Sequence, residues 1–122
     1  MKSIQYLKTI SNDTKLRLVS LLLENELCVC ELEEILNIKQ VNISKNLNSL
    51  KDAGIVDSRK DKQRAFYFLS QEFMTNTFLV EHIRELKLKE DKLKKDYENF
   101  ISHEEVKDQN VYVCNIFRKE AN

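Results

Sequence analysis

The chain has 122 residues, with one glycine, no proline and equal numbers of acidic and basic side chains. This length excludes two domains of ordinary size, and the scarcity of glycine and proline predicts a mainly helical protein with short connections. The first residues lack the apolar run of a signal peptide, and no stretch is long enough to span a bilayer, which indicates a cytoplasmic protein with no membrane segment.

Three short helical patterns occupy the N-terminal third of the chain. Apolar residues at helical spacing predict a first helix over residues 4–10. Asn12 or Asp13 can cap a second helix, because both side chains accept hydrogen bonds from unpaired backbone N–H groups. A third helix begins near residues 28–30. Asn37 closes it, because asparagine tolerates the left-handed conformation found at helix ends.

The next segment predicts a fourth helix followed by a β-hairpin. The helix runs from about residue 40 to 53, and Gly54 fits its C-terminal cap. A strand begins at residues 55–56, and residues 64–69 alternate as a second strand does. The link at residues 59–63 lacks the glycine of a tight turn, so we expect a longer hairpin tip. The pattern is a helix-turn-helix with an adjoining hairpin.

From about Asn76 the sequence is helical again. Apolar residues at alternating spacings of four and three form a heptad-like seam, with Glu90 filling the one gap. We expect one long helix that contacts a second copy of the chain, with packing on its own domain as the alternative. We expect a domain over residues 1–101 and an extension over 102–122 that docks through residues 111–117. The seam comprises Leu79, Ile83, Leu86, Leu93, Tyr97 and Phe100.

Positive charge is concentrated in the middle of the chain. Residues 39–67 hold seven Lys or Arg and three Asp, for a net charge of +4, whereas the segments on either side each carry −2. A local excess of cations is what a phosphate-contacting surface requires. The distribution therefore indicates a DNA-binding element within a mildly acidic protein.

The outward face of the fourth helix carries side chains that can read DNA bases. Amides bond adenine edges, Lys45 can bond guanine or phosphate, and Val41 can touch a thymine methyl. An ordinary solvated helix face is the alternative, and the adjoining basic hairpin favours DNA, because its cations can reach phosphates or the minor groove. The candidate DNA-binding residues are Gln40, Val41, Asn42, Ser44, Lys45 and Asn48 on the helix and Arg59, Lys60, Lys62 and Arg64 on the hairpin.

Residues 41–56 and the hairpin at 57–70 resemble the ArsR/SmtB family of winged-helix metal-sensing repressors, as do residues 13–18. The resemblance covers roughly residues 4–85. It implies a winged helix-turn-helix, a homodimer joined through the first and last helices, binding to an inverted-repeat operator, and release by an inducer. The chain departs from the family at Lys39, where serine or threonine is usual, and in lacking a glycine at the wing tip.

Two cysteines one residue apart lie just before the helix-turn-helix, in the segment ELCVCEL. Cys28 and Cys30 together form a soft chelating pair. The segment resembles the sensing site of the arsenic- and cadmium-responsive branches of the family. In the arsenic branch a third cysteine commonly lies where this chain has Glu33. The third donor must then come from elsewhere, with Cys114 as the remaining cysteine, or two thiolates alone hold the ion.

The spacing of the pair suggests a switch. On a regular helix, residues two apart point about 200° from each other, so chelation by Cys28 and Cys30 requires the first turn to unwind or the pair to sit at a non-helical entrance. Because the third helix packs behind the recognition helix, either change in backbone conformation can shift the recognition helix. We also expect the helix N-terminus to lower the pKa of these thiols, which favours the thiolate form.

The predicted inducer is As(III) or Sb(III), which form three-coordinate complexes with thiolates. Cd(II), Pb(II) and Zn(II) are alternatives, and zinc or cadmium would need Glu33, His103 or water to complete a shell of four donors. We expect His82 on the surface and His103 at a helix end.

Other interpretations of the same residues remain. The three cysteines can be buried core residues, or they can form a redox switch that depends on Cys114. The chain can also be a winged-helix interaction module without DNA binding, which the basic hairpin disfavours. No phosphate-binding glycine loop and no nucleophile paired with a base occurs, so we do not expect an enzyme.

Overall fold

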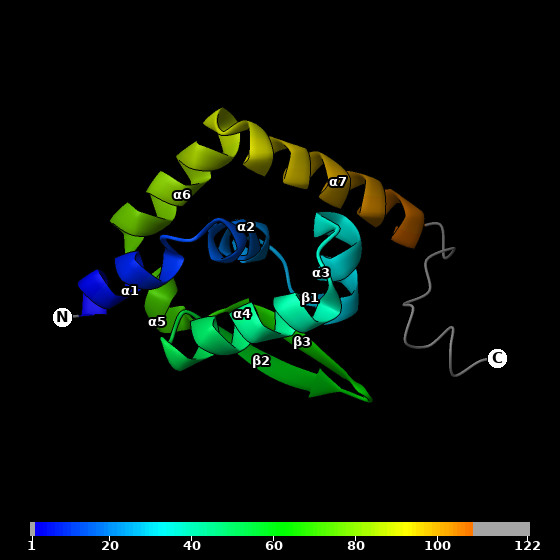
Figure 1. Cartoon of the computed structure of the whole chain (residues 1–122), viewed down its shortest axis with the longest axis horizontal. Coiled ribbons are helices and arrows are strands. Elements are labelled where there is room, and N and C mark those ends of the chain that lie inside the picture. Colours follow the sequence, from blue (N-terminus) through cyan, green and yellow to red (C-terminus); the bar gives the residue numbers. More distant parts are fainter. Residues whose placement is uncertain (1, 109–122) are drawn as a thin grey trace.

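The computed structural model describes residues 2–108, which form seven helices and a small antiparallel sheet at one edge of the molecule (Figure 1). The helices are α1 (Lys2–Ile10), α2 (Asp13–Leu22), α3 (Val29–Leu36), α4 (Gln40–Asp52), α5 (Gln71–Met74), α6 (Thr77–Lys89) and α7 (Asp91–Asp108). The strands are β1 (Leu27–Cys28), β2 (Val56–Asp61) and β3 (Arg64–Leu69), in the order β1-β3-β2. The fold is the predicted winged helix-turn-helix, with α3 and α4 as the helix pair and β2–β3 as the wing.

The helix ends follow the predicted capping residues. The Asn12 side chain accepts a hydrogen bond of 3.0 Å from the backbone N–H of Lys15 at the start of α2. Asn37 ends α3 with φ 56°, and Gly54 follows α4 with φ 79°, both in the left-handed region. These caps fix where α2, α3 and α4 begin and end, and so they fix the short turn between α3 and α4.

The core lies where α2, α3 and α4 meet the wing. The apolar stripe predicted for the recognition helix is buried there, and α2 passes through the middle of the molecule (Figure 1). Burying an aliphatic or aromatic side chain of this size contributes about 1.5–3 kcal/mol. Side chains with no exposed surface include Leu18, Leu32, Ile43, Leu47, Leu50, Ile55 and Phe73.

The wing ends in a tight turn, so the prediction of a longer hairpin tip was wrong. Asp61 pairs with Arg64, which leaves a two-residue turn at residues 62–63. Lys62 takes the left-handed conformation, with φ 61°, that a glycine usually supplies in such a turn. The wing tip is therefore a short two-residue turn that carries Lys62.

A two-residue strand, which the sequence did not predict, joins the wing to the helix-turn-helix. In β1, Leu27 pairs with Tyr67, and Cys28 pairs with Phe66 of β3. A strand this short has too few residues to show an alternating pattern. It connects the residues just before α3 directly to the wing.

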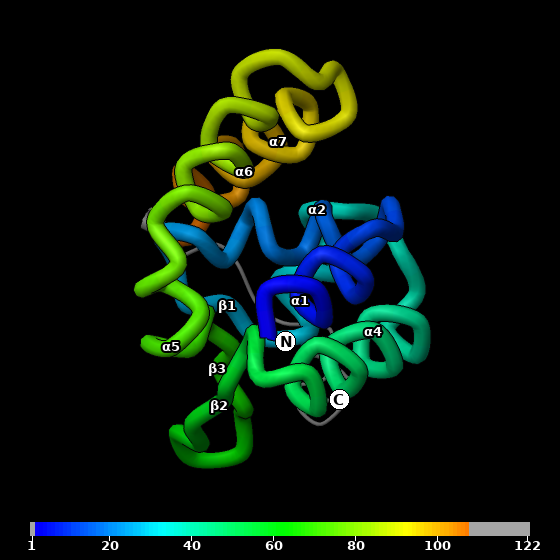
Figure 2. Tube along the Cα trace, turned by 90° about the vertical axis from the view of Figure 1, so that its left-hand side faces the viewer, coloured from blue at the N-terminus to red at the C-terminus, as the bar shows by residue number. Residues whose placement is uncertain are grey.

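The expected single helix after Asn76 is two helices, and that prediction was wrong. The chain leaves the helical conformation at Glu90, with φ −85° and ψ 122°. Figure 2 shows α6 rising away from the wing and α7 running back from the bend. Leu93 and Phe100 on α7 are buried within the chain's own core region, so this half of the seam packs on its own domain.

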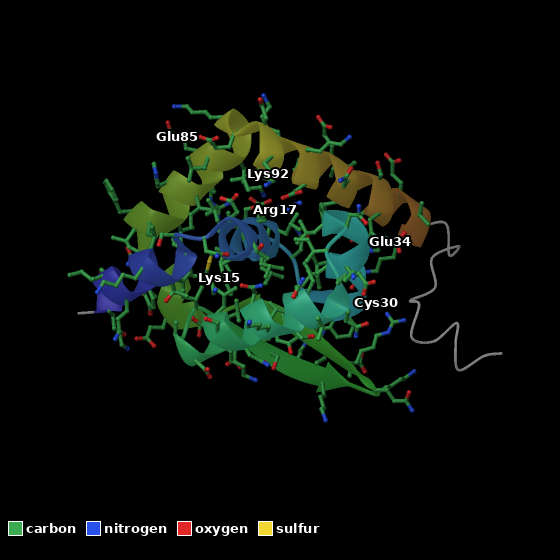
Figure 3. All side chains as sticks on the ribbon, viewed as in Figure 1. Lys15, Arg17, Cys30, Glu34, Glu85 and Lys92 are labelled. Carbon is green, nitrogen blue, oxygen red and sulfur yellow. The ribbon has the colours of Figure 1, made fainter. Side chains whose placement is uncertain are left out.

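A buried ion pair fixes α7 to α2. Arg17 Nε and Nη2 donate hydrogen bonds of 2.9 Å to the two carboxylate oxygens of Asp96, and Figure 3 shows Arg17 between α2 and α7. Arg17 also donates to the Leu36 carbonyl at 3.3 Å, and Asn99 donates to the Ile35 carbonyl, at the end of α3. Helix α7 is thus attached to both α2 and α3.

No helix within residues 2–108 is long and apolar enough to cross a membrane. Helix α7 continues past residue 101, where we placed the end of the domain. Cys114 and the apolar segment at residues 111–117 lie outside the described residues.

Candidate thiol site and DNA-binding surface

The two neighbouring cysteines lie at the junction of β1 and α3. Cys28 ends β1 and is the N-cap of α3 in an extended conformation, with φ −90° and ψ 166°, whereas Cys30 is in the first turn of the helix. Both are buried, and they form a small cluster against the ring of Phe66 (Figure 3 labels Cys30). Cys28 therefore sits at a non-helical entrance, whereas Cys30 lies within the helix, so only one member of the pair has the non-helical position considered for chelation.

The immediate surroundings of Cys28 favour its neutral form. The Cys28 thiol is free, and burial raises its pKa, with the nearby Glu31 carboxylate acting in the same direction. Hydrogen bonding to the Glu31 backbone and the charge of Arg64 oppose the shift without overcoming it. The expectation that the helix N-terminus lowers this pKa was wrong for Cys28, because burial outweighs the helix end.

A buried carboxylate lies directly beside this thiol. Glu31 accepts a 3.2 Å hydrogen bond from the Cys28 backbone N–H, so the third helical residue caps its own helix. His103 Nε2 lies 2.9 Å from Glu31 Oε2, and Lys107 Nζ donates to the same oxygen at 3.0 Å. Burial opposes ionisation, but the hydrogen bonds from His103 and Lys107 prevail and lower the Glu31 pKa to about 2.

The histidines lie in different environments. His103 is in the last third of α7, as a helix-end residue should be, but it is buried against α3. His82 is exposed on α6, as expected. Sequence reasoning missed Glu31, although its position three residues after the N-cap is the capping-box spacing.

The recognition helix presents a polar outer face. Gln40, Asn42, Lys45 and Asn48 are exposed and Ser44 is half-buried. Val41 is 73% exposed, which is unusual for a β-branched apolar residue on a helix that otherwise buries its apolar side chains. In both views α4 and the wing lie on the side of the molecule opposite the α6–α7 bend (Figures 1 and 2). The candidate base-reading side chains therefore share one surface with the wing.

The four basic residues of the wing are not equivalent. Lys60 and Lys62 are exposed. Arg59 Nη2 lies 2.7 Å from a carboxylate oxygen of Glu26, and its guanidinium stacks 5.1 Å from the centre of the Phe66 ring. Arg64 is half-buried. The wing cations thus include two exposed lysines and an arginine that is already paired within the chain.

An exposed apolar surface extends over α1 and α6. Phe78 of α6 is 89% exposed, and Ile4 and Leu7 of α1 are exposed as well. A hollow between the two helices is lined by Leu7, Phe78 and Leu79 together with polar groups including His82. An exposed phenylalanine in an apolar patch marks an interaction surface. This patch lies on α1, the first helix, and on α6, the first half of the segment that the sequence predicted as a single last helix.

Residues 12–58 match the protein family described as bacterial regulatory protein, arsR family. The cadmium resistance transcriptional regulatory protein CadC of Listeria innocua is 40% identical over 65 residues, covering 52% of this chain and 55% of CadC. The arsenic resistance transcriptional regulator ArsR1 of Pseudomonas putida is 41% identical over 66 residues, covering 53% of this chain and 52% of ArsR1. The structure of HlyU from Vibrio cholerae superposes with a TM-score of 0.64 at 34% identity, covering 72% of this chain and 94% of HlyU. The matches to CadC and ArsR1 thus span about half of each relative.

Proposed function

Because the chain belongs to the arsR family of bacterial regulatory proteins, we propose that it is a metalloid-responsive transcriptional repressor. It binds an inverted-repeat operator as a homodimer, and As(III) or Sb(III) releases it by binding cysteine thiolates. The family consists of regulators, which confirms the prediction that the chain is not an enzyme.

The position of Cys28 is the observation that carries the proposal. This residue belongs to β1, which pairs with the wing, and it also caps α3, the first helix of the helix-turn-helix. A ligand that draws the Cys28 sulfur towards Cys30 must shift the strand, the first turn of α3, or both. The strand is paired with the wing and α3 precedes the recognition helix, so either shift reaches a part of the fold that meets DNA.

Ligand chemistry supports a metalloid inducer. Cys28 and Cys30 supply two sulfurs from one small cluster once the disulfide bond of Cys30 is reduced, and Cys114, outside the described residues, supplies the third. Three thiolates satisfy a trivalent arsenic or antimony ion, and soft sulfur donors suit it better than the carboxylate of Glu33. The names of ArsR1 and CadC connect relatives of this chain with arsenic and cadmium resistance.

DNA binding in this proposal uses the exposed face of α4 in the major groove. The amides and Lys45 contact base edges or phosphates, and Lys60 and Lys62 extend the contact through the wing. The apolar surface around Phe78 pairs two copies through α1 and α6. A two-fold dimer then presents two recognition helices, which an inverted-repeat operator matches.

A competition experiment tests the inducer. A labelled inverted-repeat DNA, selected by the metal-free protein from a random library, is followed by fluorescence anisotropy. Arsenite, antimonite, Cd(II), Pb(II), Zn(II) and the thiol oxidant diamide are added separately. Arsenite and antimonite are expected to dissociate the complex. Cys28→Ser and Cys30→Ser should bind the DNA and resist release, whereas the matched control Val29→Ala, between the two cysteines, should respond as the wild type does.

Each alternative predicts a different result. Release by Cd(II), Pb(II) or Zn(II) but not arsenite would assign a divalent-ion repressor. Release by diamide alone would assign a redox sensor. Loss of DNA binding in both serine variants without any inducer would show that the thiols are structural, and the sensor assignment would fail.

A further inference from the structure

The seam between α3 and α7 contains a cluster of metal-binding side chains that does not depend on the cysteines. Glu31, His103 and Glu104 place their ligand atoms within 4.8 Å of one another. Glu31 and His103 are buried and Glu104 is half-buried. We propose that this cluster is a second cation site, for a divalent ion of the Zn(II) class, and that the Lys107 ammonium group competes with the ion for it. The site goes beyond the proposed function, because none of its three ligands is a thiol.

A positive charge already lies beside two of the three proposed ligands. Lys107 Nζ lies 3.0 Å from Glu31 Oε2 and 3.9 Å from Glu104 Oε1, so the ammonium sits between the two carboxylates. A buried carboxylate needs such a partner, because an uncompensated buried charge is strongly destabilising. The Lys107 side chain is 44% exposed, whereas Glu31 is 1% exposed. The lysine can therefore withdraw into solvent and leave the buried acceptor to another cation.

The donor set indicates which ion would replace the lysine. One imidazole nitrogen and two carboxylate oxygens suit Zn(II), which binds both donor types at about 2.0–2.2 Å and keeps a fourth position for water. Magnesium and calcium prefer oxygen donors alone, and a soft trivalent metalloid prefers sulfur. The site therefore selects a different class of ion from the one proposed for the thiols.

The spacing requires little rearrangement. Ligand atoms that surround a tetrahedral Zn(II) lie roughly 3.4 Å apart, as its bond lengths dictate. His103 Nε2 and Glu31 Oε2 are 2.9 Å apart, so this pair needs to separate by only a few tenths of an ångström. The half-buried Glu104, whose ligand atom lies within 4.8 Å of the other two, must move to the ion after Lys107 withdraws. Glu31 also accepts a hydrogen bond from the Cys28 backbone N–H. An ion here would therefore join α7 to the N-terminus of α3.

The test uses the full chain with Cys28, Cys30 and Cys114 all replaced by serine, so that Zn(II) cannot bind through sulfur. Zn(II) is titrated in competition with a chromophoric chelator, and Co(II) is added separately for its visible absorption. We expect one ion per chain and a Co(II) spectrum without sulfur charge-transfer bands. His103→Gln should weaken Zn(II) binding at least tenfold, because even residues outside the ligand shell cost about 10–100-fold when replaced.

Two partly exposed residues give a sharper comparison. Glu104→Gln removes a ligand and should weaken Zn(II) binding, whereas Lys107→Met removes the competitor and should tighten binding several-fold. Glu105→Gln, at the exposed neighbouring position on α7, is the matched control and should change nothing. A purely structural ion-pair cluster predicts that Lys107→Met lowers stability and leaves Zn(II) affinity unchanged, and this result would overturn the proposal.

The wild-type protein separates this proposal from the proposed function. If the triple serine variant does not fold, the same Glu104→Gln and Lys107→Met changes in the wild type must still shift Zn(II) affinity in opposite directions. Equal affinities in these two variants would reject the site. Release of DNA by arsenite is measured independently, so its failure would remove the thiol sensor and leave the α3–α7 site standing.

Discussion

The buried ion pair between α2 and α7 allows a quantitative prediction. Replacing Asp96 by asparagine keeps the side-chain shape but removes the charge that Arg17 binds through two hydrogen bonds of 2.9 Å. Asp96 is 2% exposed and Arg17 is 16% exposed, so the guanidinium left behind cannot easily be hydrated. Within residues 2–108 it would retain the 3.3 Å hydrogen bond to the Leu36 carbonyl.

The expected loss follows from the desolvated charge. Two unit charges about 4 Å apart attract by about 4 kcal/mol at an effective dielectric constant of 20. Removing one partner of a buried pair typically costs about 3–5 kcal/mol. A domain of this kind has a total stability of about 5–15 kcal/mol, so Asp96→Asn should remove a large part of it. The expected fall in Tm exceeds about 10 °C.

Urea denaturation followed by circular dichroism measures this loss. Lys95→Ala, at the exposed neighbouring position on α7, is the control and should leave the midpoint nearly unchanged. The double variant Arg17→Met with Asp96→Leu should recover most of the stability, because well-packed apolar residues often replace a buried ion pair without loss. A cost below about 1 kcal/mol for Asp96→Asn, with an unchanged denaturant slope, would refute the claim that this pair fixes α7.

Three further predictions concern the surfaces. Lys45→Ala should weaken DNA binding and should reduce the slope of log K against log salt concentration by about 1. Lys92→Ala on α7 is the control and should change neither quantity, and anisotropy titrations at several salt concentrations measure both. Phe78→Glu should raise the dimer dissociation constant at least about tenfold in sedimentation equilibrium without changing the helical content, and an unchanged constant would place the dimer contact elsewhere. Lys62→Gly should stabilise the protein by up to about 1 kcal/mol in urea, because glycine adopts a positive φ without the cost paid by other residues. A destabilised Lys62→Gly variant would mean that the lysine side chain, not its backbone, matters at the wing tip.

Local sequence signals predicted the helix-turn-helix well. Asn12, Asn37 and Gly54 act through their own backbone geometry or within one helical turn, so their effect on helix ends could be predicted from the sequence alone. The apolar stripe of α4 likewise needs only its own periodicity. The existence of the thiol pair beside α3 was also visible in the sequence, although its burial was not.

Features that depend on distant contacts could not be predicted. The bend at Glu90 preserves the heptad spacing on either side, so the pattern alone cannot distinguish one helix from two. Glu31 and His103 are 72 residues apart in the chain, and no periodicity connects them. The raised pKa of Cys28 has the same origin, because burial in the folded chain outweighs the local effect of the helix end. Such features follow from tertiary packing.

The bend at Glu90 divides the C-terminal helical segment into one helix that packs on its own core and one that keeps an exposed apolar surface. Helix α7 returns to complete the core of its own chain with Leu93 and Phe100, whereas α6 keeps Phe78 outside. A chain that closes its own core does not need a partner in order to fold. Any dimer built on α1 and α6 would therefore come apart on dilution before its subunits unfold. Occupancy of a two-fold DNA site would then fall with the square of the protein concentration. The number of copies in the cell would therefore itself set how much of the DNA is bound.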